Sequence, residues 1–182
     1  MRLYFVGGIH GSGKTTLCRN LAAKLRAPHH SAGELIRLGG ESQEVRDKTV
    51  RDVKKNQTLL LSALNDLRNA GTATVILDGH YTVVDSTGAI CPVEIEVFHA
   101  LNPSSLVLVD SEPELVVKRL RERDNRDYSL TFVEHHAREE KAHAETISRT
   151  LQIPLLLLSA YATADALASQ LVSPNAIHYG VS

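Results

Sequence analysis

Hydrophobic residues are distributed along the chain in two alternating patterns. Short apolar runs, typical of buried strands, occur at residues 3–6, 72–77, 106–109 and 154–158, with a short strand or extended link expected at 27–32. Between these runs, apolar residues recur three or four positions apart, which predicts helices at residues 15–25, 33–38, 58–70, 92–101, 111–123, 131–151 and 163–172. Strands that alternate with helices indicate an α/β fold, in which helices cover both faces of a parallel sheet of about five strands.

Glycine, proline and capping residues mark the expected ends of several helices. Gly39-Gly40 should break the second expected helix, and Gly71 should cap the third. Capping boxes at 111–114 and 131–134 should open the helices that contain them, and Pro92 lies near the expected start of another.

Three further segments lie outside this regular alternation. Residues 41–55 are highly charged with few apolar positions, which predicts a surface helix. Residues 85–88 read as a turn between two short extended pieces, and the tail from Ser173 is expected to be loosely held.

A glycine-rich segment stands between the first expected strand and the first long helix. The segment Gly8-Ile9-His10-Gly11-Ser12-Gly13-Lys14-Thr15, followed by Thr16, fits the Walker A pattern G-x-x-x-x-G-K-[ST]. Glycines permit positive φ and place no Cβ in the way, so consecutive amides can turn toward phosphate oxygens. Lys14 is expected to reach the β- and γ-phosphates of ATP, and the Thr15 hydroxyl to ligate Mg²⁺. This order of strand, loop and helix predicts a P-loop NTPase fold with three layers.

A carboxylate follows the second apolar strand, in the segment Asp78-Gly79-His80. In a parallel sheet this position lies at the same edge as the glycine loop, so Asp78 is expected to hold Mg²⁺ through water. The alternative is an aspartate that only caps the end of a strand. His10 and His80 belong to the same edge and are candidates for substrate contact.

Arg119, Arg123 and Arg126 are spaced four and three residues apart and would line up on one helical face. Arginines beside a phosphate chain can neutralise the charge that develops during phosphoryl transfer. The spacing alone, however, favours an ordinary solvated face with local ion pairs.

Glu140 and His143 form a single Glu-x-x-His, a spacing found in helix bundles that bind two metal ions. Such sites need a second copy of the motif and two more glutamates, and the sequence has no second copy. A solvated helix face is therefore the favoured interpretation for these two residues.

The composition of the chain indicates which binding partners and which cellular compartment to expect. The chain has 182 residues, enough for one domain spanning 1–182, and a formal net charge of −1, which argues against nucleic acid as a partner. Its two cysteines are not paired in a C-x-x-C motif, which favours a reducing compartment. Without a signal-like start or a long apolar run, we expect a cytoplasmic protein with no membrane association.

The order of these motifs resembles the nucleoside monophosphate kinases, and most closely the compact archaeal-type adenylate kinases. The resemblance covers about residues 2–158. It is carried by the glycine loop, Ser31-Ala32-Gly33-Glu34-Leu35-Ile36-Arg37, Asp78-Gly79-His80-Tyr81, Asn102-Pro103, the strand 106–109, Glu112-Pro113-Glu114 and Arg123-Asp124-Asn125-Arg126-Asp127. The glycine loop is specific for the superfamily. The other segments are individually weaker, and they support the resemblance mainly because they occur in the same order.

The resemblance implies roles for particular residues. The ATP-binding set would be Gly8, His10, Gly11, Ser12, Gly13, Lys14, Thr15, Thr16 and Arg119. The catalytic set would be Lys14, Arg119, Arg123 and Arg126, with residues 119–130 as a short lid. The acceptor side would be formed by helices within 33–70 and by Gly33, Arg37, Asp78, His80 and Arg138, while Thr15 and Asp78 would hold Mg²⁺. Ala32 stands where many adenylate kinases have a threonine, which weakens the expectation of adenine as the acceptor base.

The expected activity is the reaction ATP + AMP = 2 ADP, or its equivalent with another nucleoside monophosphate. One alternative is a P-loop kinase that phosphorylates a hydroxyl of a small metabolite, with Glu34 or Asp78 as the base. Another is an adenylate-kinase-like ATPase that acts as an assembly or regulatory factor, with residues 41–55 as a surface for a protein or RNA partner.

Overall fold

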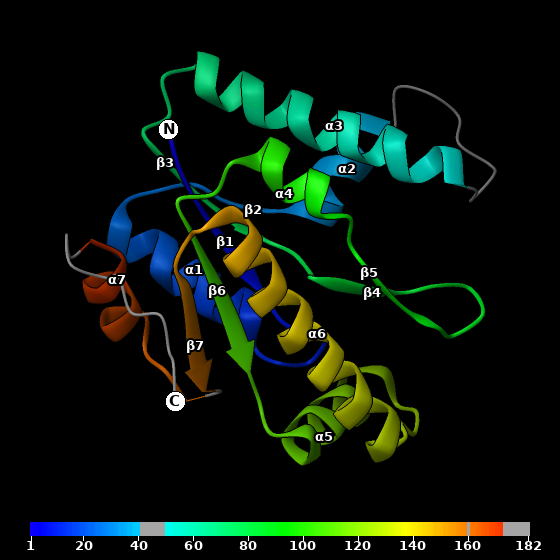
Figure 1. Cartoon of the computed structure of the whole chain (residues 1–182). Helices are drawn as coiled ribbons and strands as arrows, with labels where there is room; N and C mark the ends of the chain where they lie inside the picture. The colour runs from blue at the N-terminus through cyan, green and yellow to red at the C-terminus, as the bar shows by residue number, and fades with distance from the viewer. Residues whose placement is uncertain (41–49, 160, 173–182) are drawn as a thin grey trace.

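The computed structural model describes residues 1–40, 50–159 and 161–172, with the side chains of 50–54 excluded. Five strands form one sheet, and every neighbouring pair in it is parallel. In spatial order the strands are β2 (His29–Ser31), β3 (Thr74–Asp78), β1 (Arg2–Gly7), β6 (Ser105–Asp110) and β7 (Leu155–Ser159) (Figure 1). The predicted parallel sheet of about five strands is confirmed.

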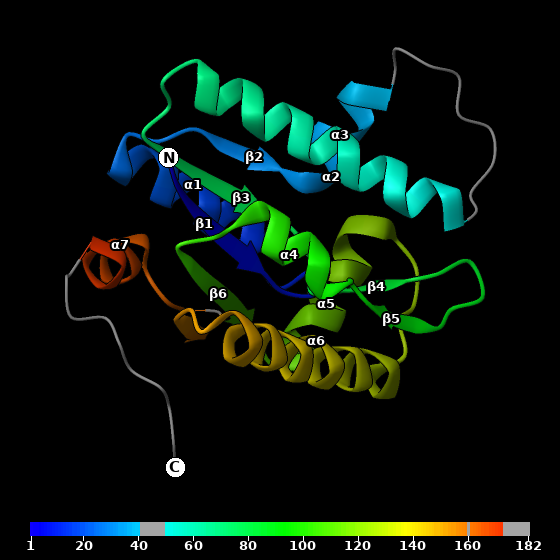
Figure 2. The same ribbon diagram turned by 45° about the horizontal axis from the view of Figure 1, so that its top comes forward.

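Helices cover both faces of this sheet. One face carries α1 (Lys14–Leu25) and α7 (Ala164–Val172), and the other carries α3 (Val50–Asn69), α4 (Ile95–Leu101) and α6 (Leu130–Leu151). The helix α2 (Ala32–Gly40) lies beside α3, and α5 (Pro113–Asp124) lies beside α6 (Figures 1 and 2). In Figure 1, α5 is at the end of the molecule opposite α2 and α3. The three-layer α/β architecture expected for a P-loop protein is therefore present.

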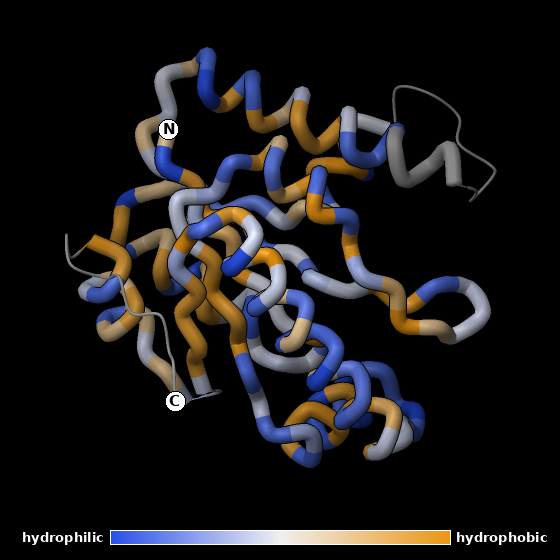
Figure 3. Tube along the Cα trace, in the orientation of Figure 1, coloured by the Kyte–Doolittle hydropathy of each residue, from blue (hydrophilic) through white to orange (hydrophobic). Residues whose placement is uncertain are grey.

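Each central strand contributes side chains to two separate cores, because successive residues of a strand point to opposite faces. In β1, Leu3 and Phe5 pack with the helices α3, α4 and α6, whereas Val6 packs with α1 and α7. In Figure 3, β6 and β7 are hydrophobic along most of their length. A strand buried on both faces has no polar side, which explains the continuous apolar runs of the sequence.

A short antiparallel hairpin projects away from the sheet (Figure 2). It pairs β4 (Thr82–Val84) with β5 (Ile90–Pro92), and its turn includes residues 85–88, as the sequence predicts. Pro92 ends β5, so its expected place at a helix start is wrong. The helix α4 begins three residues later, at Ile95.

Two helices near the acceptor-side segment, α2 and α3, border the gap in the described residues, and the start of α3 differs from expectation. The helix α2 continues through Gly39-Gly40, where a Cβ on Gly39 would lie 3.2 Å from a methyl carbon of Leu59. The approach of α3 therefore leaves little room for a side chain at Gly39, and α2 is described as far as Gly40, beyond which the described residues stop. The helix α3 begins at Val50, inside the segment 41–55 that we expected to form a separate surface helix. Residues 41–49 and the tail from Ser173 lie outside the described residues.

Of the three helix caps predicted from the sequence, the one at Gly71 is confirmed, and those at Ser111 and Thr131 are wrong. Gly71 has φ 79°, and the Thr72 amide donates to the Leu67 carbonyl, as in a glycine-capped helix end. The helix α5 begins at Pro113, and its N-cap residue Glu112 makes no side-chain cap. The Ser111 hydroxyl does not cap it either, because it donates to the Ser12 carbonyl. The helix α6 is capped by Ser129, whose hydroxyl accepts from the Phe132 amide, so Thr131 is not the cap.

Within the part of the chain that the structure describes, no helix combines the length and hydrophobicity needed to cross a membrane.

Candidate functional site

The glycine-rich loop joins the carboxyl end of β1 to the start of α1, as predicted. Gly8, Gly11 and Gly13 all have positive φ. Gly13, at φ 93°, is the residue immediately before α1, and a Cβ there would lie 3.3 Å from Nη1 of Arg119. A side chain at this position would therefore be strained in its backbone and crowded by the guanidinium, which explains why glycine is needed.

The loop and the first turn of α1 have the properties of an anion site. The α1 helix begins at Lys14, and the amides of its first turn have no partner within the helix. These amides and the positive end of the helix dipole attract phosphate. Lys14 is buried, and a cavity of about 310 Å³ is lined by residues 9–16, Arg119, Leu120 and Arg123.

Arg119 lies against the glycine loop and is therefore not part of an ordinary solvated helix face. Its Nη1 donates to the carbonyls of Gly11 and Ser12, at 3.3 and 3.1 Å. The Ser111 hydroxyl donates to the same Ser12 carbonyl at 2.7 Å. Ser111, just before α5, and Arg119, in its second turn, thus hold the loop from one side. The expected capping box did not predict this contact of Ser111.

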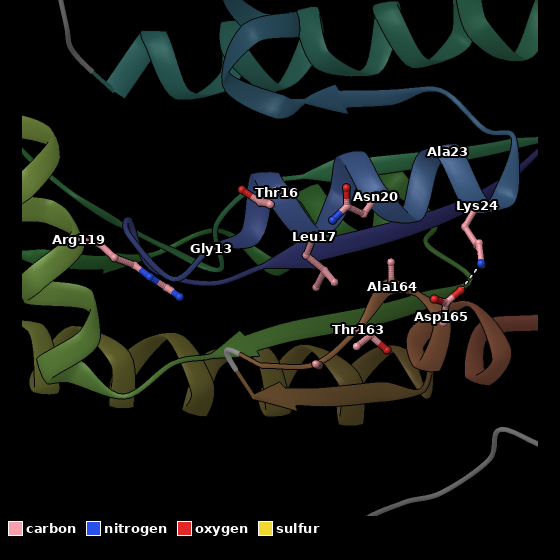
Figure 4. A pocket seen from close by; sticks show the side chains of 11 residues that line it. Gly13, Thr16, Leu17, Asn20, Ala23, Lys24, Arg119, Thr163, Ala164 and Asp165 are labelled. Carbon is pink, nitrogen blue, oxygen red and sulfur yellow. Dashed lines mark ion pairs between the residues drawn. The ribbon is translucent and has the colours of Figure 1, made fainter.

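A second, larger cavity of about 710 Å³ continues from the loop along α1 (Figure 4). Gly13, Thr16 and Arg119 line both cavities. The far part of the larger one is lined by Asn20, Lys24, Ala162, Thr163, Ala164 and Asp165, with Lys24 and Asp165 joined as an ion pair. This volume is within the range of small-molecule sites.

The other two arginines of the series are placed differently from Arg119. Arg123 lines the smaller cavity, and its Nε and Nη2 donate to Asp124 at 2.6 and 2.8 Å. That pairing raises the pKa of Arg123. Arg126 lies beyond the end of α5, with its guanidinium 4.8 Å from the centroid of the Tyr128 ring. The three arginines therefore do not share one helical face.

Asp78 ends β3, paired in register with Val6 just before the glycine loop. Its carboxylate is buried, and Oδ2 lies 2.8 Å from Nε2 of His29, the first residue of β2. No motif or spacing in the sequence marks His29 as a partner of Asp78. Oxygen ligands such as the Asp78 carboxylate and the Thr15 hydroxyl suit Mg²⁺, so the donor set at this edge fits that ion.

Two histidines of the loop edge lie together. The ring centroids of His10 and His80 are 4.3 Å apart. Burial, followed by the charge of Lys14, lowers the pKa of both imidazoles, that of His80 to about 2. Both rings are therefore neutral near pH 7 and can act only as hydrogen-bond donors or acceptors.

Glu140 connects α6 to this edge, so the predicted solvated face is wrong for it. Its side chain is 1% exposed. Oε1 accepts from the amides of Gly8 and Tyr81, both at 3.0 Å, and Oε2 accepts from the amide and hydroxyl of Thr82, at 2.6 and 2.5 Å. The nearby His143 instead contacts the Val93 carbonyl at 2.7 Å.

A signal for Glu140 does exist in the sequence. It lies seven residues after Val133 and seven before Ile147, both buried, and so falls on the apolar stripe of α6. A charged residue on such a stripe is rarely buried without partners. That pattern indicates a buried carboxylate, although it does not identify the donors.

Of the residues expected on the acceptor side, Asp78 and His80 lie at the loop edge, and the other three are on the surface of helices. Gly33 and Arg37 are exposed on α2, and Arg138 is exposed on α6. Both cavities described above are lined by other residues.

Comparisons with known proteins agree with this arrangement. The AAA domain family matches residues 7–136. Adenylate kinase isoenzyme 1 of Bos taurus is 31% identical over 124 residues, which cover 67% of this chain and 64% of that enzyme. An adenylate kinase homolog of Methanothermobacter thermautotrophicus is 25% identical over 122 residues, covering 65% of this chain and 62% of that protein. The chain thus matches somewhat less than two thirds of the length of these relatives.

Solved structures of kinases share the fold. A putative kinase from Chloroflexus aurantiacus has a TM-score of 0.55 at 18% identity and covers 92% of both chains. A sugar kinase from Janibacter sp. has a TM-score of 0.51 at 17% identity, covering 93% of this chain and 91% of that one. With a glycine loop between β1 and α1, a parallel five-stranded sheet and a family match over most of its length, this chain belongs to the AAA domain family of P-loop proteins and is similar in sequence to adenylate kinases.

Proposed function

We propose that this protein transfers the γ-phosphoryl group of ATP to a nucleoside monophosphate, with AMP as the expected acceptor. The observation that carries the proposal is the pair of adjoining cavities, of about 310 and 710 Å³, which share Gly13, Thr16 and Arg119. The smaller one is lined by the glycine loop and suits a triphosphate. The larger one runs along α1 and suits the nucleoside. Sequence similarity to adenylate kinases supports the choice of reaction.

The residues of the loop would act by position and charge. Lys14, the first amides of α1 and Arg119 would bind the phosphates of ATP, and Arg123 would neutralise charge that develops between donor and acceptor. A phosphate monoester is already ionised near neutral pH, so this reaction needs no general base. Arg119 is already held in place by two loop carbonyls, so little ordering is needed when ATP binds.

Thr15 and Asp78 would hold the Mg²⁺ that accompanies ATP. An ion bound by these two residues would supply positive charge that neutralises part of the negative charge of the phosphates. His29 would keep the Asp78 carboxylate in a fixed orientation through the 2.8 Å contact to Oδ2. The chain's own contribution is thus an oriented carboxylate and a hydroxyl on adjoining elements.

The acceptor would bind between the loop and the helices α2 and α3. Arg37 would grip its phosphate, Gly33 would permit close approach, and the neutral His80 would offer a hydrogen bond beside the loop. Residues 119–130 would form a short lid, with Arg126 and Arg138 completing the phosphate clamp when it closes. We also expect the protein to work in the cytoplasm without nucleic acid.

Phosphorylation of a metabolite hydroxyl is the second candidate. It is favoured by one observation, the buried pair of Asp78 and His29, because such an acceptor must lose a proton to a base. An assembly or regulatory role would rest on residues 41–55, most of which lie outside the described residues.

A coupled assay with ATP-Mg²⁺ and each of AMP, GMP, CMP, UMP and dTMP tests the proposal. We expect ADP formation with at least one monophosphate, and loss of that activity in Lys14→Met. If no monophosphate is phosphorylated by the folded protein, the proposal is wrong. ATP hydrolysis that rises only when a purified protein or RNA partner is added would instead support the regulatory alternative.

A further inference from the structure

Three side chains with different donor atoms converge behind the phosphate loop. Cys18 comes from α1, His29 from the start of β2 and Asp78 from the end of β3. One potential ligand atom from each lies within 4.8 Å of the other two. All three side chains are largely shielded from solvent: Cys18 is fully buried, and the side chains of His29 and Asp78 are 14% and 6% exposed.

The donor types select a class of metal. A thiolate, an imidazole and a carboxylate together are typical of zinc sites, whereas Mg²⁺ prefers oxygen ligands only. Three protein ligands with a fourth position left to water is an arrangement that zinc readily adopts. We propose that Cys18, His29 and Asp78 form a site for Zn²⁺ or a similar thiophilic divalent cation, distinct in its ligands from the expected Mg²⁺ site.

Small movements would bring these atoms to coordination distances. Tetrahedral zinc, with bonds of about 2.3 Å to sulfur and 2.0–2.2 Å to nitrogen or oxygen, places its ligand atoms roughly 3.4–3.6 Å apart. The His29 and Asp78 atoms would separate from 2.8 Å by a fraction of an ångström. The longest separation, at most 4.8 Å, would shorten by about 1 Å, within reach of a rotation at Cys18.

Charge balance supports occupation by a divalent cation. Burial raises the pKa of the Cys18 thiol, so without a metal it stays protonated. Metal binding forms an S–metal bond and releases the thiol proton to solvent. Zn²⁺ with one thiolate, one carboxylate and a neutral imidazole then has no net charge, which lowers the cost of placing the ion in this buried position. The nearby Lys14 opposes the ion to some extent.

The site has a functional consequence that rests on the proposed kinase activity. Asp78 cannot serve zinc and orient water on Mg²⁺ in the same way, so zinc would inhibit phosphoryl transfer. Zinc would bind at Cys18, His29 and Asp78, none of which lines the two substrate cavities. The chemistry therefore predicts inhibition that depends on Cys18, a residue outside the ATP-binding set.

Titration with Co²⁺ tests the site without any assay of activity. Cobalt accepts zinc ligands, and a bound thiolate gives it a charge-transfer band in the near ultraviolet. We expect this band at one equivalent of Co²⁺ in the wild type and in Cys91→Ser, and its loss in Cys18→Ala. Added Zn²⁺ should abolish the band, and His29→Gln should weaken Co²⁺ binding by at least about tenfold. Cys18→Ser provides a second variant if Cys18→Ala unfolds.

Two outcomes would overturn the proposal. One is a wild-type protein with no thiolate band, and the other is a band that persists in folded Cys18→Ala. Zinc inhibition is measured separately, at fixed ATP-Mg²⁺, and should be at least about tenfold weaker in Cys18→Ala than in the wild type. If the band appears but no monophosphate is phosphorylated, the metal site stands and only the proposed kinase activity fails.

Discussion

Replacing Glu140 with glutamine should destabilise the protein more than any neighbouring charge change on α6. The carboxylate accepts four hydrogen bonds, two at each oxygen, from Gly8, Tyr81 and Thr82. Glutamine keeps one acceptor oxygen and replaces the other with an NH₂ group. If the oxygen faces Gly8 and Tyr81, the new NH₂ group faces the Thr82 amide, so two donors meet where the wild type has a 2.6 Å hydrogen bond.

The magnitude follows from the contacts that are lost. A hydrogen bond to a charged group contributes about 1.5–3 kcal/mol, and a buried donor left without a partner costs about 1–3 kcal/mol. The Thr82 hydroxyl can rotate to accept from the new NH₂ group, which offsets part of the loss. We expect Glu140→Gln to lower the free energy of unfolding by about 2–4 kcal/mol. Glu140→Ala would orphan three buried amides, at a cost of about 3–9 kcal/mol that approaches the whole stability of a typical domain.

Urea denaturation at pH 7 measures this change, with Glu139→Gln as the matched control. Glu139 is adjacent on α6, but its side chain is 52% exposed, so its replacement should alter stability by less than about 0.5 kcal/mol. The melting temperature of Glu140→Gln should fall by about 4–16 °C, at roughly 2–4 °C per kcal/mol. A Glu140→Gln protein as stable as Glu139→Gln would refute the account of Glu140 as the acceptor that holds the loop edge together.

Three other predictions address pH, packing and ATP binding. Stability should fall as the pH drops below about 6.5, by up to about 1.4 kcal/mol per pH unit for each of the imidazoles of His80 and His136. The unfolded chain takes up protons at these two residues that the folded chain excludes. Urea denaturation at pH 7 and pH 5 checks this; equal stabilities would contradict it. Gly7→Ala should lower the free energy of unfolding by at least about 1–3 kcal/mol, since its Cβ would lie 2.1 Å from the Tyr81 ring, and an unchanged melting temperature would disprove this. Arg119→Ala should lower kcat/KM for ATP about 100–1,000-fold, whereas the exposed Arg121→Ala should not; equal effects would exclude the role proposed for Arg119.

Local patterns in the sequence determined much of the fold. Four apolar runs predicted β1, β3, β6 and β7, since a strand buried on both faces needs hydrophobic residues at nearly every position, whereas the polar β2 was expected only as a short strand or extended link. The glycine loop was predicted in its place between β1 and α1, and Gly71 was predicted as a helix end with positive φ. These features depend on a residue's own backbone and its close neighbours along the chain, so a single stretch of sequence contains the information.

The tertiary structure decided which groups meet at the site. Glu140 reaches Gly8 across 132 positions, Ser111 reaches Ser12 across 99, and His29 reaches Asp78 across 49. The capping box at Ser111 was wrong for the same reason, because the hydroxyl found a partner in the loop instead of in its own helix. The spacing of Arg119 favoured a solvated face, and only the packing of α5 against the loop shows that its guanidinium contacts the loop carbonyls. Hydrogen bonds between distant segments depend on how strands and helices pack in three dimensions, and no local pattern of residue types specifies that packing.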